Sequence, residues 1–513
     1  MRSVAPYVLA IDLGTTGVKV AAVARDGLVR GAASESFTTA FTADGGAEQD
    51  AEQWWQAIGR CARLAVHDSG DPDGAVAVAV TAQYMSVVAI DAQGVPLAPV
   101  VMWMDTRGEA HHPLRDDGDA FMLWLDRHGL PPLPNDDLAH AAVLRSTHPE
   151  IEARVAAIVE PVDALVARLS GRIVATATTA FPLMCTDNRE WSRVAYDPEL
   201  VARAGVDPAQ LPPIVASDEP IGPLTSEAAA HLGLPSRVLV MPGTVDSITS
   251  AVGGGALDPS RVALVIGTTS VMATHVGAKA ADLAHGISSM PSPLSERYFV
   301  MAENGVGGRA LDTWLHQVVF ADDELASGAP PADGFARAEA AAARVAPGSG
   351  GVIYFPWLTG SIAPAPDDDV RGGFAGLGLS TSRAEMTRAV YEGVALNAAW
   401  LLEPFAAFTG VDYDVMTFGG GGARSALWGE LLADACGIAI ERLAEPQYTN
   451  ARGAARLAFG VLGEIDPDSG PPPPVAQVHH PDPERHELYR ALRDRFAAFH
   501  TAASGWYRAA RRG

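Results

Sequence analysis

Two short apolar runs separated by a small turn open the chain. Residues 7–11 are apolar, Asp12 follows them, and residues 17–23 consist mostly of small and β-branched residues. Between the two runs lies a Gly-Thr-Thr turn at residues 14–16. Runs of this length that are bounded by turn residues are typical of strands. The pattern predicts a β-hairpin with an unusual turn.

The same plan recurs in the second half of the chain. Residues 263–276 again pass from an apolar run through a Gly-Thr-Thr turn, which begins with Gly267 and Thr268, into β-branched residues. A repeated strand-turn-strand unit predicts two similar domains that face one another and offer their turns to one ligand. We place these domains at residues 1–241 and 242–513. A chance match in a chain rich in Gly and Ala is the alternative interpretation.

Periodicity and turn residues predict the other elements. Strands are expected within residues 76–90 and 98–105, and residues 111–203 carry helical and Pro-containing pieces that suggest a cap on the first sheet. A second sheet should begin at residues 237–246. The C-terminal part should contain a helix at 382–405, a strand, glycine loop and helix at 415–437, a Pro-rich surface loop at 467–484 and a closing helix at 485–511.

Composition narrows the class of protein. Of the 513 residues, 48% are hydrophobic, and no apolar run is long enough to cross a bilayer, so we expect a cytoplasmic protein without a membrane partner. The net charge of −24 disfavours nucleic acid, which binds clustered Lys and Arg. Cys61, Cys185 and Cys436 lack metal-site or disulfide spacing and suit a reducing compartment. A homodimer is the commonest assembly, but the sequence does not address it.

Three turns that contain glycine could hold phosphate or ribose. Because Gly has no Cβ, the backbone N–H groups at residues 14–16, 267–268 and 419–422 can approach an anion closely. None of them is a Walker A loop, since no Gly-Lys-Ser/Thr follows at the required spacing. Each turn alone could be an ordinary loop, whereas the matched pair in the two halves favours a nucleotide site.

Two aspartates stand beside such turns or at a strand end. Asp12 ends the first strand, where a carboxylate can hold Mg²⁺ against phosphates, directly or through water, or can satisfy the backbone donors of the turn. Asp246 lies between a predicted strand and a predicted helix. Spacing alone favours a helix cap there, and the functional alternative is a general base for a substrate hydroxyl. Such a base, a metal site and two donor-rich turns are sufficient for phosphoryl transfer.

Four segments carry a family resemblance. GGFAGLGLSTSRAEMTRAVYE at residues 372–392 matches the second signature of the FGGY carbohydrate kinases, and residues 419–437 resemble their adenosine-binding loop and helix. AIDLGTTGVKV at 10–20 is similar to the family's first phosphate motif, and MPGTVDS at 241–247 resembles the segment that holds its catalytic Asp. The order and the separations agree over nearly the whole chain, and the pattern is most like that of xylulokinases.

The resemblance implies an α/β fold with two actin-like, ribonuclease H-like domains that flank a cleft for ATP, Mg²⁺ and a small sugar or polyol. It assigns the general base to Asp246 and the metal to Asp12, with Asp246 beside it. It places on ATP the residues Gly14, Thr15, Thr16, Gly267, Thr268, Gly421, Gly422 and Ala423. It places on the sugar the residues Gln83, Tyr84, Met85, Trp103, Asp105 and Asp246.

The sugar-contacting segment departs from the family pattern. Xylulokinases usually carry Gly-Gln-Met-His-Gly where residues 82–86 read Ala-Gln-Tyr-Met-Ser, so the substrate-contacting His is missing. The Arg-Glu pair of glycerol kinases is absent, the first signature is degraded at His140 and Val143, and Ser247 replaces a common Asn. We therefore expect a ketose or polyol kinase, with a ketopentose such as D-xylulose as the first expectation and another ketose, an alditol or a sugar acid as the alternative.

Two functions outside this class compete with it. A nucleotide-gated interaction protein of the actin or heat-shock branch would need a further domain after the ATPase, and only residues 421–513 remain for one. A degenerate kinase that acts as a sensor would explain the altered sugar segment, but the retained Asp12 and Asp246 argue against it. An ATPase that activates a dehydratase through an iron–sulfur cluster is disfavoured by the scattered cysteines.

Overall fold

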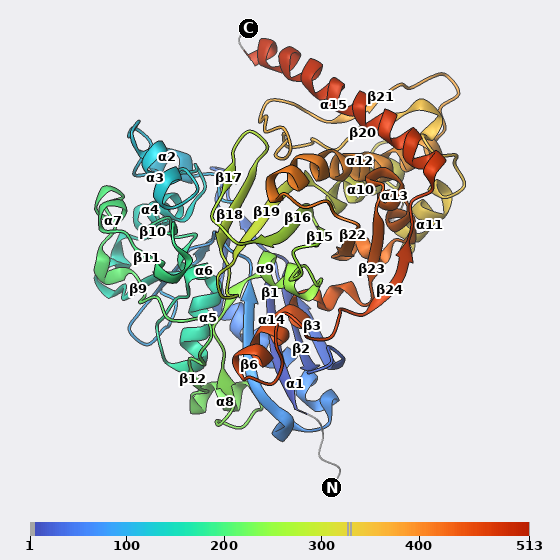
Figure 1. The fold of residues 1–513 in the computed structure, drawn as a ribbon. Helices are drawn as coiled ribbons and strands as arrows, with labels where there is room; N and C mark the ends of the chain where they lie inside the picture. The colour runs from blue at the N-terminus through green and yellow to red at the C-terminus, as the bar shows by residue number, and fades with distance from the viewer. Residues whose placement is uncertain (1–5, 326–327, 329–330, 512–513) are drawn as a thin grey trace.

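Two large β-sheets organise the protein (Figure 1). The structure is a computed structural model that describes residues 6–511 apart from 326–327 and 329–330. The first sheet has the strand order β12-β13-β6-β1-β2-β3, with β14 beside β6. Its strands are β1 (Tyr7–Gly14), β2 (Gly17–Ala24), β3 (Val29–Ser36), β6 (Ala75–Ala82), β12 (Gly222–Pro223), β13 (Leu239–Val240) and β14 (Thr244–Val245).

The second sheet repeats the central arrangement of the first. Its order is β17-β18-β19-β16-β15-β22-β23-β24. In the first sheet, β1 pairs antiparallel with β2 and parallel with β6, and in the second, β15 pairs antiparallel with β16 and parallel with β22. The strands are β15 (Arg261–Ile266), β16 (Thr269–Val276), β17 (Ala281–Asp282), β18 (Ile287–Pro291), β19 (Tyr298–Val306), β22 (Val415–Gly419), β23 (Ala439–Leu443) and β24 (Val475–His479). The predicted pair of matching hairpins is confirmed.

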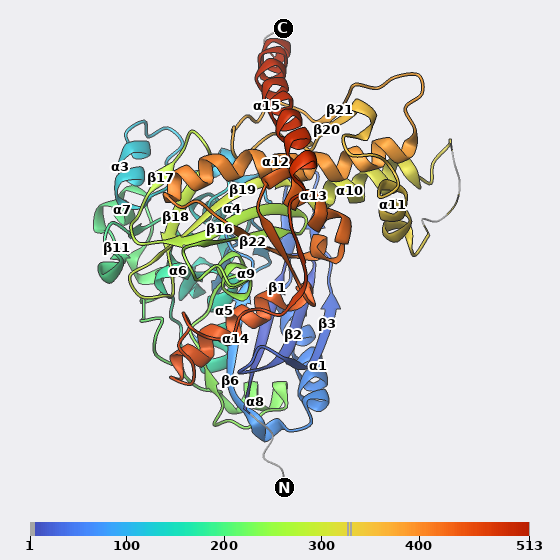
Figure 2. The same ribbon diagram turned by 45° about the vertical axis from the view of Figure 1, so that its right-hand side comes forward.

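Each sheet packs helices against its own hydrophobic core. The first core joins β1, β2 and β6 to α1 (Ala51–Ser69), α5 (Pro161–Ser170) and α8 (Ser226–Leu232). The second core joins β15, β19 and β22 to α10 (Gly308–Trp314), α11 (Gly334–Ala342), α12 (Arg383–Thr409), α13 (Ala426–Cys436) and α15 (Pro483–Arg511). The C-terminal part of α15 projects beyond this core (Figure 2). Burial of these apolar faces is the main stabilising term for both halves.

Short elements complete the chain. The helices of the predicted cap are α2 (Gly108–His111), α3 (Ala120–Arg127), α4 (Asp137–Thr147), α6 (Ala177–Ala180) and α7 (Pro198–Arg203). The short strands are β4 (Ala40–Phe41), β5 (Ala47–Gln49) and β8 (Val100–Val101) in one small sheet, β7 (Val88–Ile90) with β9 (Ala157–Val159), β10 (Thr186–Asp187) with β11 (Ala195–Tyr196), and β20 (Ile353–Phe355) with β21 (Gly373–Ala375).

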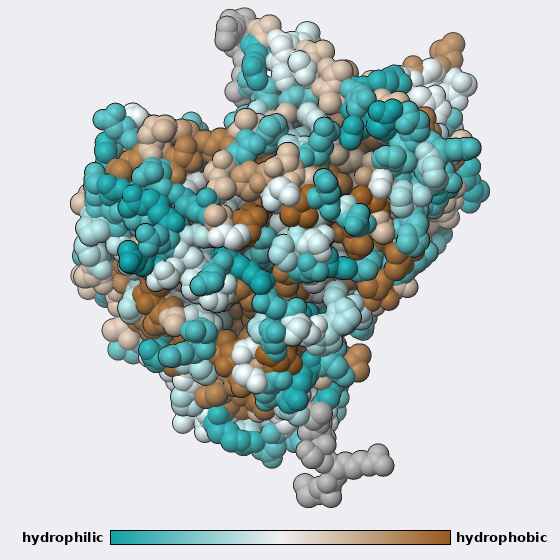
Figure 3. All heavy atoms as spheres, in the orientation of Figure 1, coloured by the Kyte–Doolittle hydropathy of each residue, from teal (hydrophilic) through white to brown (hydrophobic). Residues whose placement is uncertain are grey.

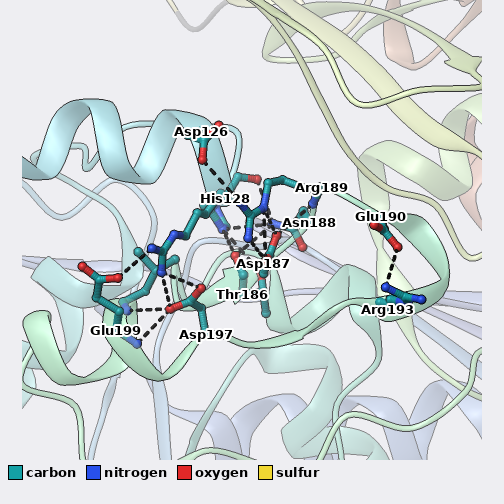
Figure 4. Close-up of polar contacts among 12 residues, drawn as sticks. Asp126, His128, Thr186, Asp187, Asn188, Arg189, Glu190, Arg193, Asp197 and Glu199 are labelled. Atoms are coloured by element: carbon teal, nitrogen blue, oxygen red, sulfur yellow. Dashed lines mark hydrogen bonds and ion pairs between the residues drawn. The ribbon is translucent and has the colours of Figure 1, made fainter.

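Ion pairs tie the cap together (Figure 4). Arg127 at the end of α3 binds Asp197 at 2.9 Å and Glu199 at 2.6 Å, which joins α3 to the start of α7. Arg189 binds Asp187 at 2.6 Å. These partly exposed pairs each contribute little to stability, and only those of Arg127 connect two helices of the cap.

Hydrophobic residues on the surface are scattered. Figure 3 shows them as separate areas on a largely hydrophilic face. Single exposed apolar residues such as Leu379 and Trp506 are normal for folded proteins. None of the helices in the described part of the chain has both the length and the apolar character that a bilayer crossing requires.

The structure corrects three sequence predictions. Residues 237–246 do not begin the second sheet, because β13 and β14 both pair with β6 of the first sheet. Pro242 and Gly243 interrupt this run, and an apolar run alone does not reveal its partner strand. The Pro-rich stretch 467–484 contains the edge strand β24, whose backbone pairs with β23. The expected strand over 98–105 shrinks to β8.

Two helices join the sheets. α9 (Asp246–Gly253) packs against strands of both sheets, and α14 (Thr449–Val461) packs on α9 and on β1. The helices cross at Gly253 and Gly453 without room for side chains. A Cβ on Gly453 would lie 1.9 Å from the carbonyl oxygen of Thr249, and one on Gly253 would lie 2.0 Å from that of Thr449. Only glycine allows this close approach.

We expect Gly453→Ala to destabilise the protein by about 1–3 kcal/mol, because the added methyl group overpacks a contact between two backbones. The measurement is the unfolding free energy in denaturant. Gly505→Ala is the matched control, since Gly505 also lies in a helix and a Cβ added there would meet no atom within 4 Å. Equal stability of the two variants would contradict the predicted role of the helix crossing.

Candidate active site

The turn between β1 and β2 connects the predicted phosphate and sugar residues. The Thr15 hydroxyl donates a hydrogen bond to Gln83 Oε1 at 2.8 Å and accepts one from Trp103 Nε1 at 3.1 Å. Gln49 Nε2 donates to the Thr15 carbonyl at 2.7 Å, and Trp54 in turn holds Gln49. The structure therefore brings Thr15, Gln83 and Trp103 into one network, with Gln49 as a support that the sequence reasoning missed.

Asp12 is held in place by groups from two distant elements. It is almost fully buried, Lys19 Nζ donates to its Oδ2 at 3.2 Å, and Asn450 Nδ2 donates to its Oδ1 at 3.2 Å. Lys19 lies opposite Asp12 in the β1–β2 register. The position of the turn in the predicted hairpin fixes this register, so the pair could have been predicted from the sequence. Asn450 comes from α14, and nothing in the local sequence pointed to it.

Asp246 is the first residue of α9, directly after β14. Its pKa is raised to about 7, first by burial and second by the negative charge of Asp12, while the backbone N–H of Ser247 and the charge of Lys19 act in the opposite direction. The N-cap residue is Val245, so no side chain caps this helix. A carboxyl with a pKa near neutrality, beside a second carboxylate, has the properties of a general base.

The second turn meets the glycine loop. The Gly308 N–H donates to the Gly267 carbonyl at 2.8 Å, and the Gly307 N–H donates to that of Thr268 at 3.0 Å. A Cβ on Gly420 would lie 2.6 Å from the carbonyl oxygen of Ile266. The loop at 419–422 and the 267–268 turn are thus packed against each other at the end of β15, as one ligand spanning both would require.

The sequence comparisons decide the family. The sequence profile of the N-terminal domain of the FGGY family of carbohydrate kinases matches residues 7–253, and that of the C-terminal domain matches residues 262–460. The chain belongs to the FGGY family of carbohydrate kinases. The predicted domain boundary after residue 241 stays a prediction for this FGGY kinase.

Some relatives of the FGGY kinase are named xylulose kinases and others gluconokinases. A xylulose kinase of Escherichia coli is 28% identical over 519 residues, which cover 95% of this chain and 97% of that protein. A gluconokinase of Bacillus licheniformis is 25% identical over 512 residues, covering 98% and 97%. The crystal structure of a xylulose kinase from Rhodospirillum rubrum has a TM-score of 0.84 at 25% identity and covers 98% of this chain and 100% of that one. The predicted fold class and the carbohydrate kinase class are confirmed.

Two predicted ligand residues of the FGGY kinase are enclosed by protein. Asp105 is fully buried and accepts hydrogen bonds from Arg107 and from the Ala47 N–H. Burial is the largest single cause and raises the pKa of Asp105, but the hydrogen bonds from Arg107 and the Ala47 N–H, together with the Arg107 charge, outweigh it, so the pKa is lowered overall. Ala423 is fully buried, its N–H donates to Gly420, and its carbonyl accepts from Arg442. In this structure neither side chain is open to a ligand. By contrast, a Cβ added at Gly421 would meet no atom within 4 Å.

The oxygen atoms near Asp12 suit a hard cation. Mg²⁺ prefers oxygen ligands and keeps several waters, so that one or two carboxylates and the substrate phosphates complete its shell. Asp12 and Asp246 supply such carboxylates close enough for their charges to interact. No cluster of three or more His, Cys, Asp or Glu residues that could enclose a metal occurs among the described residues. This donor set fits Mg²⁺ bound together with ATP and not a closed protein cage.

A buried acid pair supports the sugar-contacting segment. Met85 has a left-handed backbone with φ 59°, and its N–H donates to Glu160 Oε1 at 2.9 Å. The carboxyl groups of Glu160 and Asp137 are buried and close enough to shift each other's pKa. Burial is the main cause that raises the pKa of Asp137 to about 8 and that of Glu160 well above its usual range. The pair therefore shares protons at neutral pH, which the sequence reasoning did not foresee.

This pair should make stability depend on pH. Because both pKa values are raised in the folded protein, the unfolded chain loses its protons first, and stability falls as pH rises from about 4 through the folded values. The loss is about 1.4 kcal/mol per pH unit for each group. Glu160→Gln keeps an acceptor for Met85 and removes one titrating group. The unfolding free energy of Glu160→Gln should therefore fall less than that of the wild type as the pH rises from 5 to 8.

The matched control is Glu227→Gln, at an exposed position in α8. Its difference from the wild type should stay constant over the same pH range. A constant difference for Glu160→Gln as well would contradict the predicted proton sharing.

Proposed function

We propose that this kinase transfers the γ-phosphate of ATP to a hydroxyl of a ketose or polyol, with D-xylulose as the first substrate to test. One observation carries the proposal. Asp246, with a pKa near 7, lies beside Asp12 where α9 joins both sheets. The names of the xylulose kinase relatives support a ketopentose. The three free cysteines fit a reducing compartment, and we place the reaction in the cytoplasm, where ATP is available.

Asp246 would act on the sugar hydroxyl. Its carboxylate accepts the hydroxyl proton while the sugar oxygen forms a bond to the γ-phosphorus and the bond between this phosphorus and the oxygen of ADP breaks. The pKa of about 7 leaves a large fraction of the carboxylate unprotonated at neutral pH. A base with a pKa near the working pH combines the correct protonation state with useful basicity.

The backbone N–H groups and hydroxyls of the two Gly-Thr turns would hold the phosphates, with residues 14–16 on one side and 267–268 on the other. Asp12 would hold Mg²⁺, which neutralises phosphate charge when it is bound. Lys19 would orient Asp12 through the contact at 3.2 Å. Asn450 would fix the second carboxylate oxygen of Asp12.

Contacts between the two halves would exclude water from the reacting groups. The Tyr84 hydroxyl donates to Met301 Sδ at 3.1 Å, and the hydroxyls of Thr81 and Thr249 lie 2.8 Å apart in a hydrogen bond. Both contacts join the first sheet or its loop to elements beyond residue 245. Water that entered here could take the phosphate in place of the sugar.

The test is a coupled ADP-release assay with Mg·ATP across pentuloses, hexuloses, alditols and aldonic acids. We expect a sugar-dependent rate well above the ATPase rate without sugar, with the highest kcat/KM on a ketopentose. A rate that does not depend on any sugar, in protein shown separately to bind ATP, would overturn the proposal. That outcome would instead favour the nucleotide-gated sensor.

A further inference from the structure

Glu303 on β19 is a charged side chain that the proposed mechanism does not use. Val300 and Ala302 of this strand lie in the core of the second half. Since successive side chains of a strand point to opposite faces, Met301 and Glu303 share the other face. Met301 packs there against the cluster that contains Tyr84 and Val245. Glu303 therefore faces the junction of the two halves.

Electrostatic interactions place Glu303 close to the reacting groups. Burial raises the pKa of Tyr84 most, and the negative charges of Asp246 and Glu303 raise it further. The side chain of Ser247, the neighbour of Asp246, acts on the pKa of Tyr84 in the opposite direction and lowers it. Tyr84, from the sugar-contacting segment, is thus close enough to both the proposed base and Glu303 for their charges to affect its pKa. This places Glu303 on the sugar side of the site.

The Glu303 carboxyl has no partner among the described residues. Burial is the sole cause of its raised pKa, and no hydrogen bond or ion pair to its side chain occurs in the described part of the chain. Its main chain is fixed, because the carbonyl accepts from the Ala363 N–H at 3.0 Å and the residue pairs with Val271. The side chain is partly exposed, so its carboxyl can reach a ligand, and its fixed main chain suits a group that accepts hydrogen bonds from one.

The charges and hydrogen-bonding groups around Glu303 favour a neutral ligand that carries hydroxyl groups. A carboxylate accepts hydrogen bonds, so its natural partners are hydroxyl groups. Asp12, Asp246 and Glu303 make the site acidic, and the charge of nearby Lys19 is already paired with Asp12. The carboxylate of a sugar acid would meet these like charges, and like charges that are brought together with little water between them repel strongly.

β19 also connects Glu303 to the phosphate site. The strand ends at Val306, and the next residue, Gly307, donates to the Thr268 carbonyl at 3.0 Å. Four residues of regular strand span about 13 Å, and the irregular pairing between Glu303 and Val306 shortens this distance. Glu303 can therefore hold the part of a sugar that lies away from the transferred phosphate.

We propose that Glu303, together with Tyr84, binds hydroxyl groups of the substrate and restricts this kinase to neutral sugars and polyols, so that aldonates are excluded. This inference rests on the proposed function and narrows its substrate class. The gluconokinase activity that some relatives carry in their names is then not the activity of this chain.

The test compares kcat/KM for D-xylulose and D-gluconate in the wild type, in Glu303→Gln and in Glu303→Ala. We expect the wild type to prefer the ketose by about 100-fold or more. Both variants should raise KM for the ketose by about 10-fold or more with a smaller change in kcat, because a charge-assisted hydrogen bond is lost. Both should also lose part of the discrimination against gluconate. Glu109→Gln, at an exposed position in α2, is the control that should change neither value.

Three results would overturn the inference. If the wild type phosphorylates gluconate as efficiently as the ketose, the neutral-substrate restriction is wrong while the proposed function stands. If folded, ATP-binding Glu303→Gln and Glu303→Ala keep the wild-type KM and discrimination, Glu303 does not bind the sugar. If the wild type acts on no sugar at all, the proposed function fails and this inference fails with it.

Discussion

Asp246→Asn should lower kcat by about 10²–10⁴-fold, the range expected for loss of a general base. Asparagine keeps the shape and the hydrogen-bonding capacity of the side chain but cannot accept the proton of the sugar hydroxyl at neutral pH. ATP binding should persist, because the phosphate turns are unchanged. The measurements are steady-state ADP release with the ketose and equilibrium ATP binding. Asp207→Asn, at an exposed cap of a short helix, is the matched control.

The pH dependence of the wild type tests the same residue without substitution. Since the protonated form of Asp246 cannot act as a base, kcat/KM should rise with pH and level off above an apparent pKa of about 7. Asp246→Asn should lose this ionisation from its residual rate. Wild-type turnover in Asp246→Asn, or the same pH profile in both proteins, would remove Asp246 from the role of base.

The second large effect concerns Asp12. Asp12→Asn should lower kcat by about 10²-fold or more and shift the Mg²⁺ concentration that gives half-maximal rate upward by about 10-fold or more, because a carboxylate that neutralises the cation is lost. The measurement is a Mg²⁺ titration of the initial rate at saturating ATP.

Lys19→Met separates this effect from loss of the contact between Lys19 and Asp12. Removal of Lys19 leaves the carboxylate in place, with Asn450 still donating to it at 3.2 Å. Lys19→Met should therefore keep the Mg²⁺ midpoint close to that of the wild type, even if its rate falls. An unchanged Mg²⁺ midpoint in Asp12→Asn would contradict the metal role.

The sequence was sufficient for features that depend on local pattern. The two hairpins, α12 and the strand-loop-helix at 415–437 each combine a clear period with turn or capping residues, and all of them occur in the structure. The predicted Asp12 and Asp246 lie close enough for their charges to interact. Local pattern also explains the failures, because β13 and β14 are only two residues each and take their identity from their pairing with β6.

Features that depend on distant residues could not be predicted. Asn450 reaches Asp12 across 438 positions of sequence, and Glu303 and Tyr84 come from opposite halves of the chain. The acid pair of Asp137 and Glu160 could not be predicted either, because the sequence alone does not distinguish a buried carboxyl group from an exposed one. Residues 82–86 showed that the sugar segment had changed, but only the fold shows that Glu303 faces it.

The most direct test of phosphoryl transfer to a sugar is a ³¹P NMR time course of Mg·ATP and D-xylulose with the wild-type protein. A phosphomonoester signal that grows in step with ADP, without inorganic phosphate, is the predicted result. Formation of ADP and inorganic phosphate alone, with no sugar phosphate from this or any other sugar tried, would show transfer to water and contradict the account.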